Sequence, residues 1–160
     1  MSFETVAVLG LGKVGKLAAT LLHEAGFQVV GFDSRELRAP LPFATQRLDI
    51  SSADALAPAM ASSQAVLSCL PYHLNRQVAE VAHGLGIHYF DLTEDVPTTQ
   101  AIRELAETSR GVMAPQCGLA PGFIGIVGAD LASKFETVRA IRLRVGALPQ
   151  HPTGMLGYAF

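Results

Sequence analysis

The stretch Gly10-Leu11-Gly12-Lys13-Val14-Gly15 decides the fold. It lies between an apolar run, Thr5 to Leu9, and a helix-like run, Lys16 to Ala25. A second apolar run, Phe27 to Phe32, ends at the acid Asp33. This order of strand, glycine turn, helix, strand and acid is typical of a dinucleotide-binding βαβ unit.

The three glycines of this turn have separate physical reasons. Gly10 lets the strand turn sharply into the helix, and Gly12 has no Cβ, so that a pyrophosphate can approach the backbone. Gly15 lets the helix pack closely on the strand. The free N–H groups at the start of the helix then meet the phosphates at the positive end of the helix dipole.

The residues after the second strand bear on the choice of cofactor. Asp33 can accept hydrogen bonds from the adenosine ribose hydroxyls, which favours NAD because a 2′-phosphate would be repelled. Arg35 can instead pair with a 2′-phosphate or lie flat on adenine. Asp33 and Ser34 also fit the start of a helix or turn. We expect NAD rather than NADP.

Composition places limits on the class of protein. The chain has 160 residues, enough for one domain with a sizeable core and hardly enough for two. It is 49% hydrophobic and 16% charged, with a mean hydropathy of +0.32, as expected for strands buried on both faces. The net charge of −2, without a basic stripe or a tryptophan, argues against a nucleic-acid partner.

The cysteines and histidines indicate no metal or disulfide site. Cys69 and Cys117 do not form a CxxC pair, and the five histidines lack ligand spacing. The amino terminus lacks a basic region of the secretory kind, and no apolar stretch is long enough to span a bilayer. We therefore expect a cytoplasmic protein without a membrane or metal partner.

The rest of the chain alternates short apolar runs with helical patterns. This predicts an α/β fold of the Rossmann type over residues 1–146, a doubly wound, mostly parallel sheet with helices on both faces. Residues 147–160 read as a linker or as the start of a missing substrate and dimerisation domain. We expect strands near 5–9, 28–32, 45–48, 65–69, 88–91, 112–114 and 137–145, and helices near 13–25, 53–60, 74–84, 97–109 and 123–132.

Ligands of such sheets lie outside the carboxyl ends of the strands, where this sequence places polar residues. Asp49 can reach adenine or close a local turn. Tyr72 can offer its hydroxyl to substrate or cofactor, or it can be a half-buried packing residue whose hydroxyl is in solvent. Asp91, with Glu94 and Asp95, can supply a general base or hold a cationic substrate. The alternative for these acids is a cluster at the start of the next helix.

The segment from Pro115 to Gly122 combines a strand end, two glycines and two prolines before an apolar helix. Gly118 and Gly122 permit a positive φ or a close ligand, and Pro121 suits a first helical turn. The helix start can bind a carboxylate. Cys117 is either a nucleophile or a small buried thiol.

Six motifs together resemble the saccharopine dehydrogenase family, with the fifth the most specific to it. They are VLGLGKVGKLAATLL from Val8, LDIS at Leu48–Ser51, SCLPYHLN at Ser68–Asn75, HYFDLTED at His88–Asp95, PQCGLAPGF at Pro115–Phe123 and VGALPQ at Val145–Gln150.

The resemblance implies a Rossmann domain followed by a mixed α/β domain, and NAD(P)-linked chemistry at the amine carbon of an amino acid such as lysine or saccharopine. It implies cofactor contacts and a substrate cleft in which Tyr72 and Asp91 are the candidate catalytic residues. The implied cofactor contacts are Gly10, Gly12, Lys13, Val14, Gly15, Asp33, Asp49, Ile50, Leu70 and Pro71, and the cleft includes Cys117, Gly118, Pro121 and Gly122. The residues after the second strand add Ser34 and Arg35 to the cofactor set, which then has twelve members.

Family members continue well beyond the VGALPQ motif, whereas this chain stops ten residues later. We therefore expect a fragment that binds dinucleotide without turnover, from an enzyme that is a homodimer at full length. Two alternatives stay open. One is a nucleotide-sensing regulatory module, like those of potassium transport. The other is a different amino-acid or polyamine dehydrogenase, of the homoserine or carboxynorspermidine type.

Overall fold

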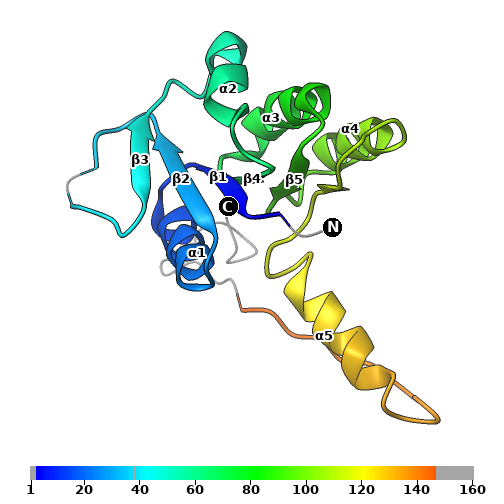
Figure 1. Ribbon diagram of the computed structural model, residues 1–160. Helices are drawn as coiled ribbons and strands as arrows, with labels where there is room; N and C mark the ends of the chain where they lie inside the picture. Colours follow the sequence, from blue (N-terminus) through cyan, green and yellow to red (C-terminus); the bar gives the residue numbers. More distant parts are fainter. Residues whose placement is uncertain (1–2, 38, 147–160) are drawn as a thin grey trace, which may run out of the picture.

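The computed structural model describes residues 3–37 and 39–146 (Figure 1). Six strands form one sheet, and every neighbouring pair is parallel. The strand order is β3-β2-β1-β4-β5-β6. Successive strands are therefore added toward one edge of the sheet up to β3 and toward the other edge from β4 on, so the switch point lies between β1 and β4. The strands are β1 (Thr5–Leu9), β2 (Gln28–Asp33), β3 (Ala44–Arg47), β4 (Ala65–Ser68), β5 (His88–Asp91) and β6 (Met113–Ala114).

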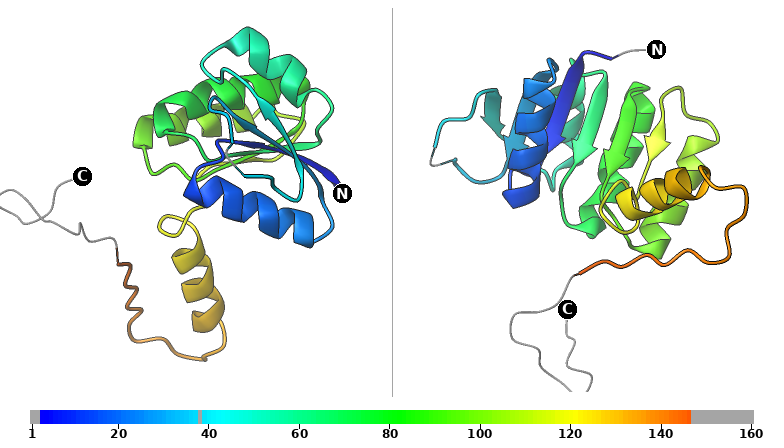
Figure 2. Two further views of the ribbon diagram at one scale, coloured as in Figure 1. Left: turned by 90° about the vertical axis from the view of Figure 1, so that its left-hand side faces the viewer. Right: turned by 90° about the horizontal axis from the view of Figure 1, so that it is seen from below.

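Helices cover both faces of the sheet. Figure 1 shows α2, α3 and α4 on one face and α1 on the other, and Figure 2 shows α5 projecting away from the sheet. The predicted Rossmann-type fold is therefore confirmed. The helices are α1 (Lys13–Glu24), α2 (Ala53–Met60), α3 (Tyr72–Leu85), α4 (Val96–Ala106) and α5 (Phe123–Ala132).

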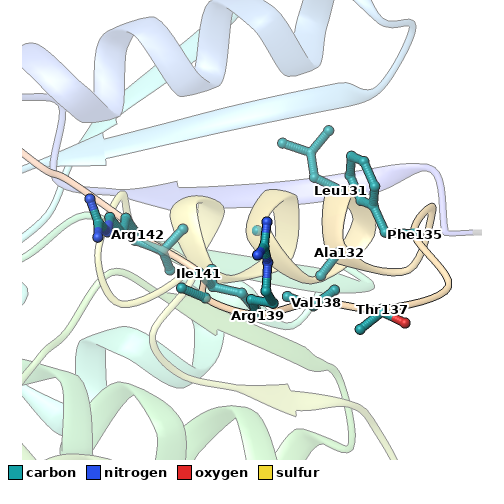
Figure 3. A pocket seen from close by; sticks show the side chains of 11 residues that line it. Leu131, Ala132, Phe135, Thr137, Val138, Arg139, Ile141 and Arg142 are labelled. Atoms are coloured by element: carbon teal, nitrogen blue, oxygen red, sulfur yellow. The ribbon is translucent and has the colours of Figure 1, made fainter.

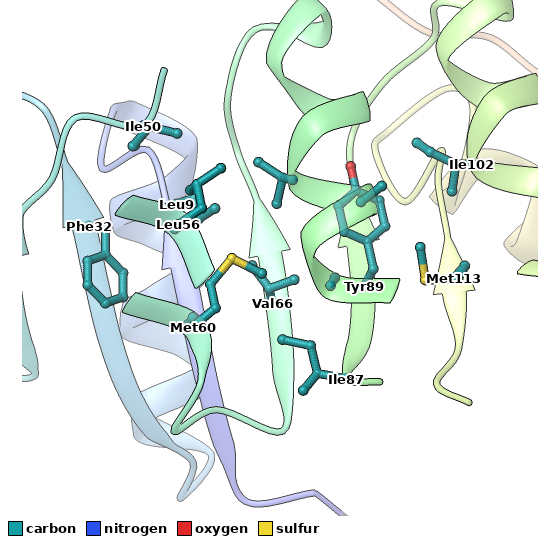
Figure 4. Close-up of a cluster of buried hydrophobic side chains, with 14 residues drawn as sticks. Leu9, Phe32, Ile50, Leu56, Met60, Val66, Ile87, Tyr89, Ile102 and Met113 are labelled. Atoms are coloured by element: carbon teal, nitrogen blue, oxygen red, sulfur yellow. The ribbon is translucent and has the colours of Figure 1, made fainter. Parts of the chain in front are cut away.

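Two hydrophobic clusters hold these layers together. The larger joins the strands to α2, α3 and α4, and Figure 4 shows Met60 and Tyr89 within it. The smaller joins Val6 and Val8 of β1 to Ala19 of α1. Because strand side chains alternate between faces, β1 supplies Ala7 and Leu9 to the first cluster and Val6 and Val8 to the second. This two-sided burial is the physical reason for the apolar composition.

The start of α3 lies two residues before the predicted one. Pro71 is its N-cap, with φ of −55° and ψ of 141°, and helical geometry begins directly at Tyr72. Ser52 is the N-cap of α2, although its side chain makes no cap hydrogen bond. Tyr72 is therefore the first helical residue rather than part of a loop.

The predicted strand over 137–145 is wrong. No β-ladder forms between residue 137 and residue 146 in the part of the chain that the structure describes. The physical reason is that a strand needs a neighbour, and this segment follows α5 away from the sheet (Figure 2). The predicted linker over 147–160 lies outside the described residues.

The glycine turn has the close approach that its sequence predicts. Gly10 has φ of +87°, and a Cβ added to Gly15 would overlap the carbonyl oxygen of Gly10. Gly12 is the N-cap of α1, and a Cβ added there would meet nothing within 4 Å. Gly15 is therefore required for packing, whereas the space beside Gly12 is open.

The substitution Gly15→Ala should destabilise the fold by about 3 kcal/mol or more, because the methyl group must push α1 away from β1. Gly12→Ala is the matched control and should change the free energy of unfolding by less than about 1 kcal/mol. Urea denaturation of the three proteins measures both values. Equal stability of the two variants would contradict the packing role of Gly15.

Candidate functional site

A cavity of about 380 Å³ opens at the carboxyl ends of the strands, across the point where the strand order reverses. Its volume lies within the range of small-molecule sites. It brings together nine of the twelve residues predicted to contact a cofactor. The lining residues are Gly10, Gly12, Asp33, Ser34, Arg35, Asp49, Ile50, Ser51, Cys69, Leu70, Pro71 and Leu74.

The other three predicted residues, Lys13, Val14 and Gly15, form the first turn of α1 and do not line the cavity. No side chain caps this helix start. Its first backbone N–H groups therefore lack an intrahelical partner and carry the positive end of the helix dipole. A helix start of this kind, beside the open space at Gly12, suits a phosphate.

Asp33 is a buried carboxylate that closes the glycine turn on β2. Its Oδ2 accepts hydrogen bonds from Leu11 N at 2.9 Å and from Arg35 Nη2 at 3.2 Å. Its Oδ1 accepts from Arg35 N at 2.9 Å and Arg35 Nε at 3.0 Å. These bonds, above all those from the guanidinium, lower the pKa of Asp33. The carboxylate therefore has its roughly four acceptor positions in use.

A second guanidinium lies beside this pair. Arg47 stands opposite Asp33 in the β2–β3 register, and its Nε donates to Ser34 O at 3.0 Å. The Arg35 side chain is 72% exposed, so donors that do not face Asp33 can reach a ligand. The carboxyl ends of β2 and β3 thus bring together two arginines and one carboxylate, an arrangement suited to an anionic group.

Asp49 closes a local turn, which is one of the two roles that its sequence position allowed. Its Oδ1 accepts from Ser51 N at 3.1 Å and from the Ser51 hydroxyl at 2.6 Å, and these bonds lower its pKa. Asp49 thus closes a local turn while it lines the cavity. Ile50, between Asp49 and Ser51, is buried in the larger hydrophobic cluster and anchors this turn to it.

Tyr72 begins α3 at the end of the loop that Leu70 and Pro71 form beside the cavity. The residue is 56% exposed, and its ring meets that of His73 edge-on at a centroid distance of 5.8 Å. Tyr72 is therefore exposed at the carboxyl edge, next to this cavity, and is not buried in the core.

Asp91 is fully buried, in contrast to the predicted contact with a substrate. Its Oδ1 accepts from Thr93 N at 2.9 Å and Gln116 N at 3.1 Å, and its Oδ2 accepts from the Tyr89 hydroxyl at 2.7 Å. Its backbone oxygen also accepts from Cys117 N at 2.7 Å. Asp91 therefore ties β5 to the loop after β6. The same burial and carboxylate raise the pKa of Tyr89, which stays a neutral donor.

The other acids beyond β5 do not gather around Asp91. Asp95 is the N-cap of α4, where its Oδ2 accepts from Thr98 N at 2.9 Å and from the Thr98 hydroxyl at 2.6 Å. These bonds lower its pKa. Glu94 is exposed one residue earlier. Asp95 is therefore a residue of the helix start, which was the alternative to a role in binding substrate.

The loop from Pro115 to Gly122 crosses the carboxyl edge beside Asp91. Gln116 has φ of +65° and Gly122 φ of +130°, and a Cβ on Gly122 would overlap backbone of this loop. Pro121 precedes the helix rather than lying in its first turn, since α5 begins at Phe123. Desolvation and the charge of Asp91 raise the pKa of the Cys117 thiol, which disfavours the nucleophilic thiolate.

The family model described as saccharopine dehydrogenase NADP binding domain matches residues 6–114, from the second residue of β1 to the end of β6. The chain belongs to this family. A nicotinamide dinucleotide is therefore its cofactor, and the expected preference for NAD over NADP has no support from the match. The family is one of oxidoreductases.

Solved structures share the fold. The apo saccharopine dehydrogenase (L-Glu forming) of Saccharomyces cerevisiae superposes with a TM-score of 0.66 at 18% identity, over 82% of this chain and 31% of that one. A D-isomer specific 2-hydroxyacid dehydrogenase of Xanthobacter autotrophicus Py2, in complex with NADPH and MES, gives 0.52 at 24% identity, over 69% and 46%. The chain thus matches about a third of the length of the yeast enzyme.

The described residues contain neither a candidate membrane span nor a candidate metal cluster. No helix there is long and apolar enough to cross a membrane. Likewise, residues 3–37 and 39–146 contain no group of three or more His, Cys, Asp or Glu side chains placed to hold a metal ion.

Some residues of the site escaped the sequence prediction. Ser51, Cys69 and Leu74 line the cavity, and each is a close neighbour of a predicted residue. Burial raises the pKa of Cys69 to about 11, so this cavity residue is a neutral thiol. Arg47 could be found only from the register of β3 on β2, which the sequence does not reveal.

The substitution Asp91→Ala should destabilise the protein by about 3 kcal/mol, because it leaves the Gln116 and Thr93 N–H groups without their acceptor. Amide hydrogen exchange at Gln116 and Cys117 should become faster through local opening of the loop, under conditions in which the protein stays folded. Asp91→Asn keeps an acceptor oxygen and should lose less than half as much. Unchanged exchange in the alanine variant would contradict the tie between β5 and the loop.

Proposed function

We propose that this chain is the cofactor-binding part of an oxidoreductase that acts on the C–N bond of an amino acid of the lysine or saccharopine type. Family membership supports the oxidoreductase class. The observation that carries the proposal is the cavity that joins the uncapped start of α1 to the Asp33–Arg35 pair. A bound nicotinamide supplies the hydride acceptor or donor, while the chain binds and orients the cofactor.

The residues present fit a dinucleotide from one end to the other. Gly12 leaves room for a pyrophosphate at the N–H groups of α1. Asp33 and Arg35 stand at the end of β2, where the adenosine ribose of such cofactors lies. Leu70 and Pro71 continue the lining along the loop after β4. The nicotinamide end then points at the region of Tyr72.

We further propose that NADP is the preferred form. Ribose hydroxyls of NAD need free acceptors, and Arg35 and Leu11 already occupy those of Asp33. A guanidinium has five N–H donors, of which Arg35 gives two to Asp33, so three stay available for a 2′-phosphate. Arg47 adds a second positive charge nearby. NADP therefore uses this arrangement as it stands, whereas NAD requires Arg35 to move.

On the substrate side, we propose separate roles for the two candidate catalytic residues. Tyr72 contacts the substrate through its exposed phenol. Asp91 is a positioning residue, because its carboxylate already accepts hydrogen bonds from Tyr89, Thr93 and Gln116. It holds in place the loop that contains Cys117, Gly118, Pro121 and Gly122, which borders the cleft.

Calorimetric titration with NADPH and NADH tests the cofactor assignment. NADPH should bind at least tenfold more tightly, a difference of about 1.4 kcal/mol. Arg35→Ala should weaken NADPH by ten- to a hundredfold and NADH much less, because it removes charge-assisted bonds to the phosphate. Arg76→Ala, on α3 outside the cavity, is the control. Tighter binding of NADH by the unaltered chain would contradict the preference.

A turnover assay tests the claim that these residues bind the cofactor without completing the enzyme. The chain is incubated with NADP⁺ and either lysine or saccharopine, and cofactor reduction is followed by absorbance. We expect tight cofactor binding and no amino-acid-dependent reduction, because the chain matches only about a third of the yeast enzyme's length. Robust turnover by the 160 residues alone would contradict this claim.

A further inference from the structure

The hydroxyl of Tyr89 has two hydrogen-bond acceptors, on two different elements. Its oxygen lies 2.7 Å from Asp91 Oδ2 and 3.2 Å from the backbone oxygen of Asn75 in α3. The single O–H proton is thus shared between the two, with the charged acceptor the closer. Tyr89 is fully buried, and Figure 4 shows its hydroxyl pointing away from Ile87. The hydroxyl is therefore a buried junction between α3 and the end of β5.

Asn75 attaches the first turn of α3 to the sheet. Its Oδ1 accepts from the Ser68 hydroxyl at 2.6 Å, and its backbone oxygen accepts from Tyr89. Asn75 is 1% exposed, so water does not compete for these bonds. The same turn begins at Tyr72, three residues earlier. The position of the exposed phenol therefore depends on two bonds whose donors lie on β4 and β5.

Asp91 connects the same hydroxyl to the loop after β6. Its Oδ1 accepts from Gln116 N at 3.1 Å, and its backbone oxygen accepts from Cys117 N at 2.7 Å. Among the described residues, Tyr89 is the only donor to the other carboxylate oxygen, Oδ2. Without the hydroxyl, this buried oxygen has no donor, and the orientation of the carboxylate is no longer fixed on that side.

The loop receives its support from Asp91 rather than from the helix that follows it. Helix α5 projects away from the sheet (Figure 2). Figure 3 shows Leu131, Phe135 and Ile141 around a hollow of about 470 Å³ between α5 and the segment after it. Because α5 is not packed against the strands, the hold of this loop on the sheet beyond β6 is at Asp91.

We infer that Tyr89 is a positioning residue, which fixes the turn that begins at Tyr72 relative to the loop from Pro115 to Gly122. This inference deepens the proposed function and rests on it for the identity of these two segments as walls of a substrate cleft. In the register of β4 and β5, Ser68 stands opposite Asp91, so the attachments of the two walls are neighbours at the carboxyl edge. The hydroxyl joins them.

A tyrosine that only fills the core also finds an acceptor for its hydroxyl. The acceptors of Tyr89 are the anchors of the two walls, at Asn75 and Asp91. Burial and the nearby carboxylate raise the pKa of Tyr89, so the hydroxyl stays a donor at neutral pH. A positioning role therefore has a specific consequence, because removal of the hydroxyl loosens both walls and leaves distant loops unchanged.

The substitution Tyr89→Phe removes the hydroxyl and keeps the ring. Amide hydrogen exchange of the whole 160-residue chain is measured by NMR without any ligand. Exchange should become at least tenfold faster at Arg76 and Gln77, the first residues whose N–H groups bond within α3. It should become at least tenfold faster also at Gln116 and Cys117, because both walls open locally.

Two controls separate this effect from a general loss of stability. Leu11 and Arg35 donate their N–H groups to Asp33 at the other end of the same edge, and their exchange should change less than twofold. Ser68→Ala removes a hydroxyl that binds only the α3 wall. It should speed exchange at the start of α3 and leave Gln116 within twofold of its original rate.

A second variant keeps Tyr89 and tests whether its proton is shared. Asp91→Asn makes the closer acceptor neutral, so the hydroxyl proton moves toward the backbone oxygen of Asn75. Exchange should become faster at Gln116 and at least twofold slower at Arg76. A residue that only fills the core gives no such opposite change on the two walls, and this variant decides the question if Tyr89→Phe does not fold.

Three results would overturn the inference. They are faster exchange on one wall alone in Tyr89→Phe, an equal change at Leu11 and Arg35, and an unchanged or faster rate at Arg76 in Asp91→Asn. None of these measurements uses a cofactor or substrate. Their failure is therefore distinguishable from failure of the proposed function, which the titration with NADPH tests.

Discussion

The contact between Gly15 and the carbonyl oxygen of Gly10 sets the position of helix α1 on strand β1. Because no side chain separates them, the uncapped start of α1 lies at the carboxyl edge of the sheet, beside the open space at Gly12. Leu11 lies between these glycines, and its side chain packs over Gly31 of β2 while its N–H reaches Asp33. The position of the uncapped start of α1 and of the Asp33 end of the cavity therefore both depend on this turn.

Two buried carboxylates organise the two ends of the carboxyl edge. Asp33, at the end of β2, accepts backbone N–H groups from Leu11 and Arg35. Asp91, at the end of β5, accepts them from Thr93 and Gln116. In both cases a charge that is costly to bury is compensated by several donors, so the loops become fixed around it. The two carboxylates differ in their partners. Asp33 also binds the exposed guanidinium of Arg35, whereas Asp91 binds the backbone of a loop and the buried Tyr89 hydroxyl.

Much of the sheet and cavity could be predicted because local sequence determines them. The glycine turn and the alternation of apolar runs place β1, α1, β5 and α5 to within a residue, and turn chemistry locates most of the cavity lining. The side-chain roles were less predictable, because they depend on contacts distant in sequence. The burial of Asp91 requires a bond to Gln116, 25 residues away, and Arg47 approaches Asp33 only through the strand register. The strand expected over 137–145 has the right periodicity but no neighbour.

The central claim is that the carboxyl-edge cavity binds a nicotinamide dinucleotide through the start of α1 and the Asp33–Arg35 pair. Titration of the ¹⁵N-labelled chain with NADP⁺, followed by backbone amide NMR, tests it most directly. We expect saturable shifts concentrated at Gly10–Gly15 and Asp33–Arg35, and little change at the opposite, amino-terminal ends of the strands. Shifts confined to other surfaces, or none at millimolar cofactor, would contradict it.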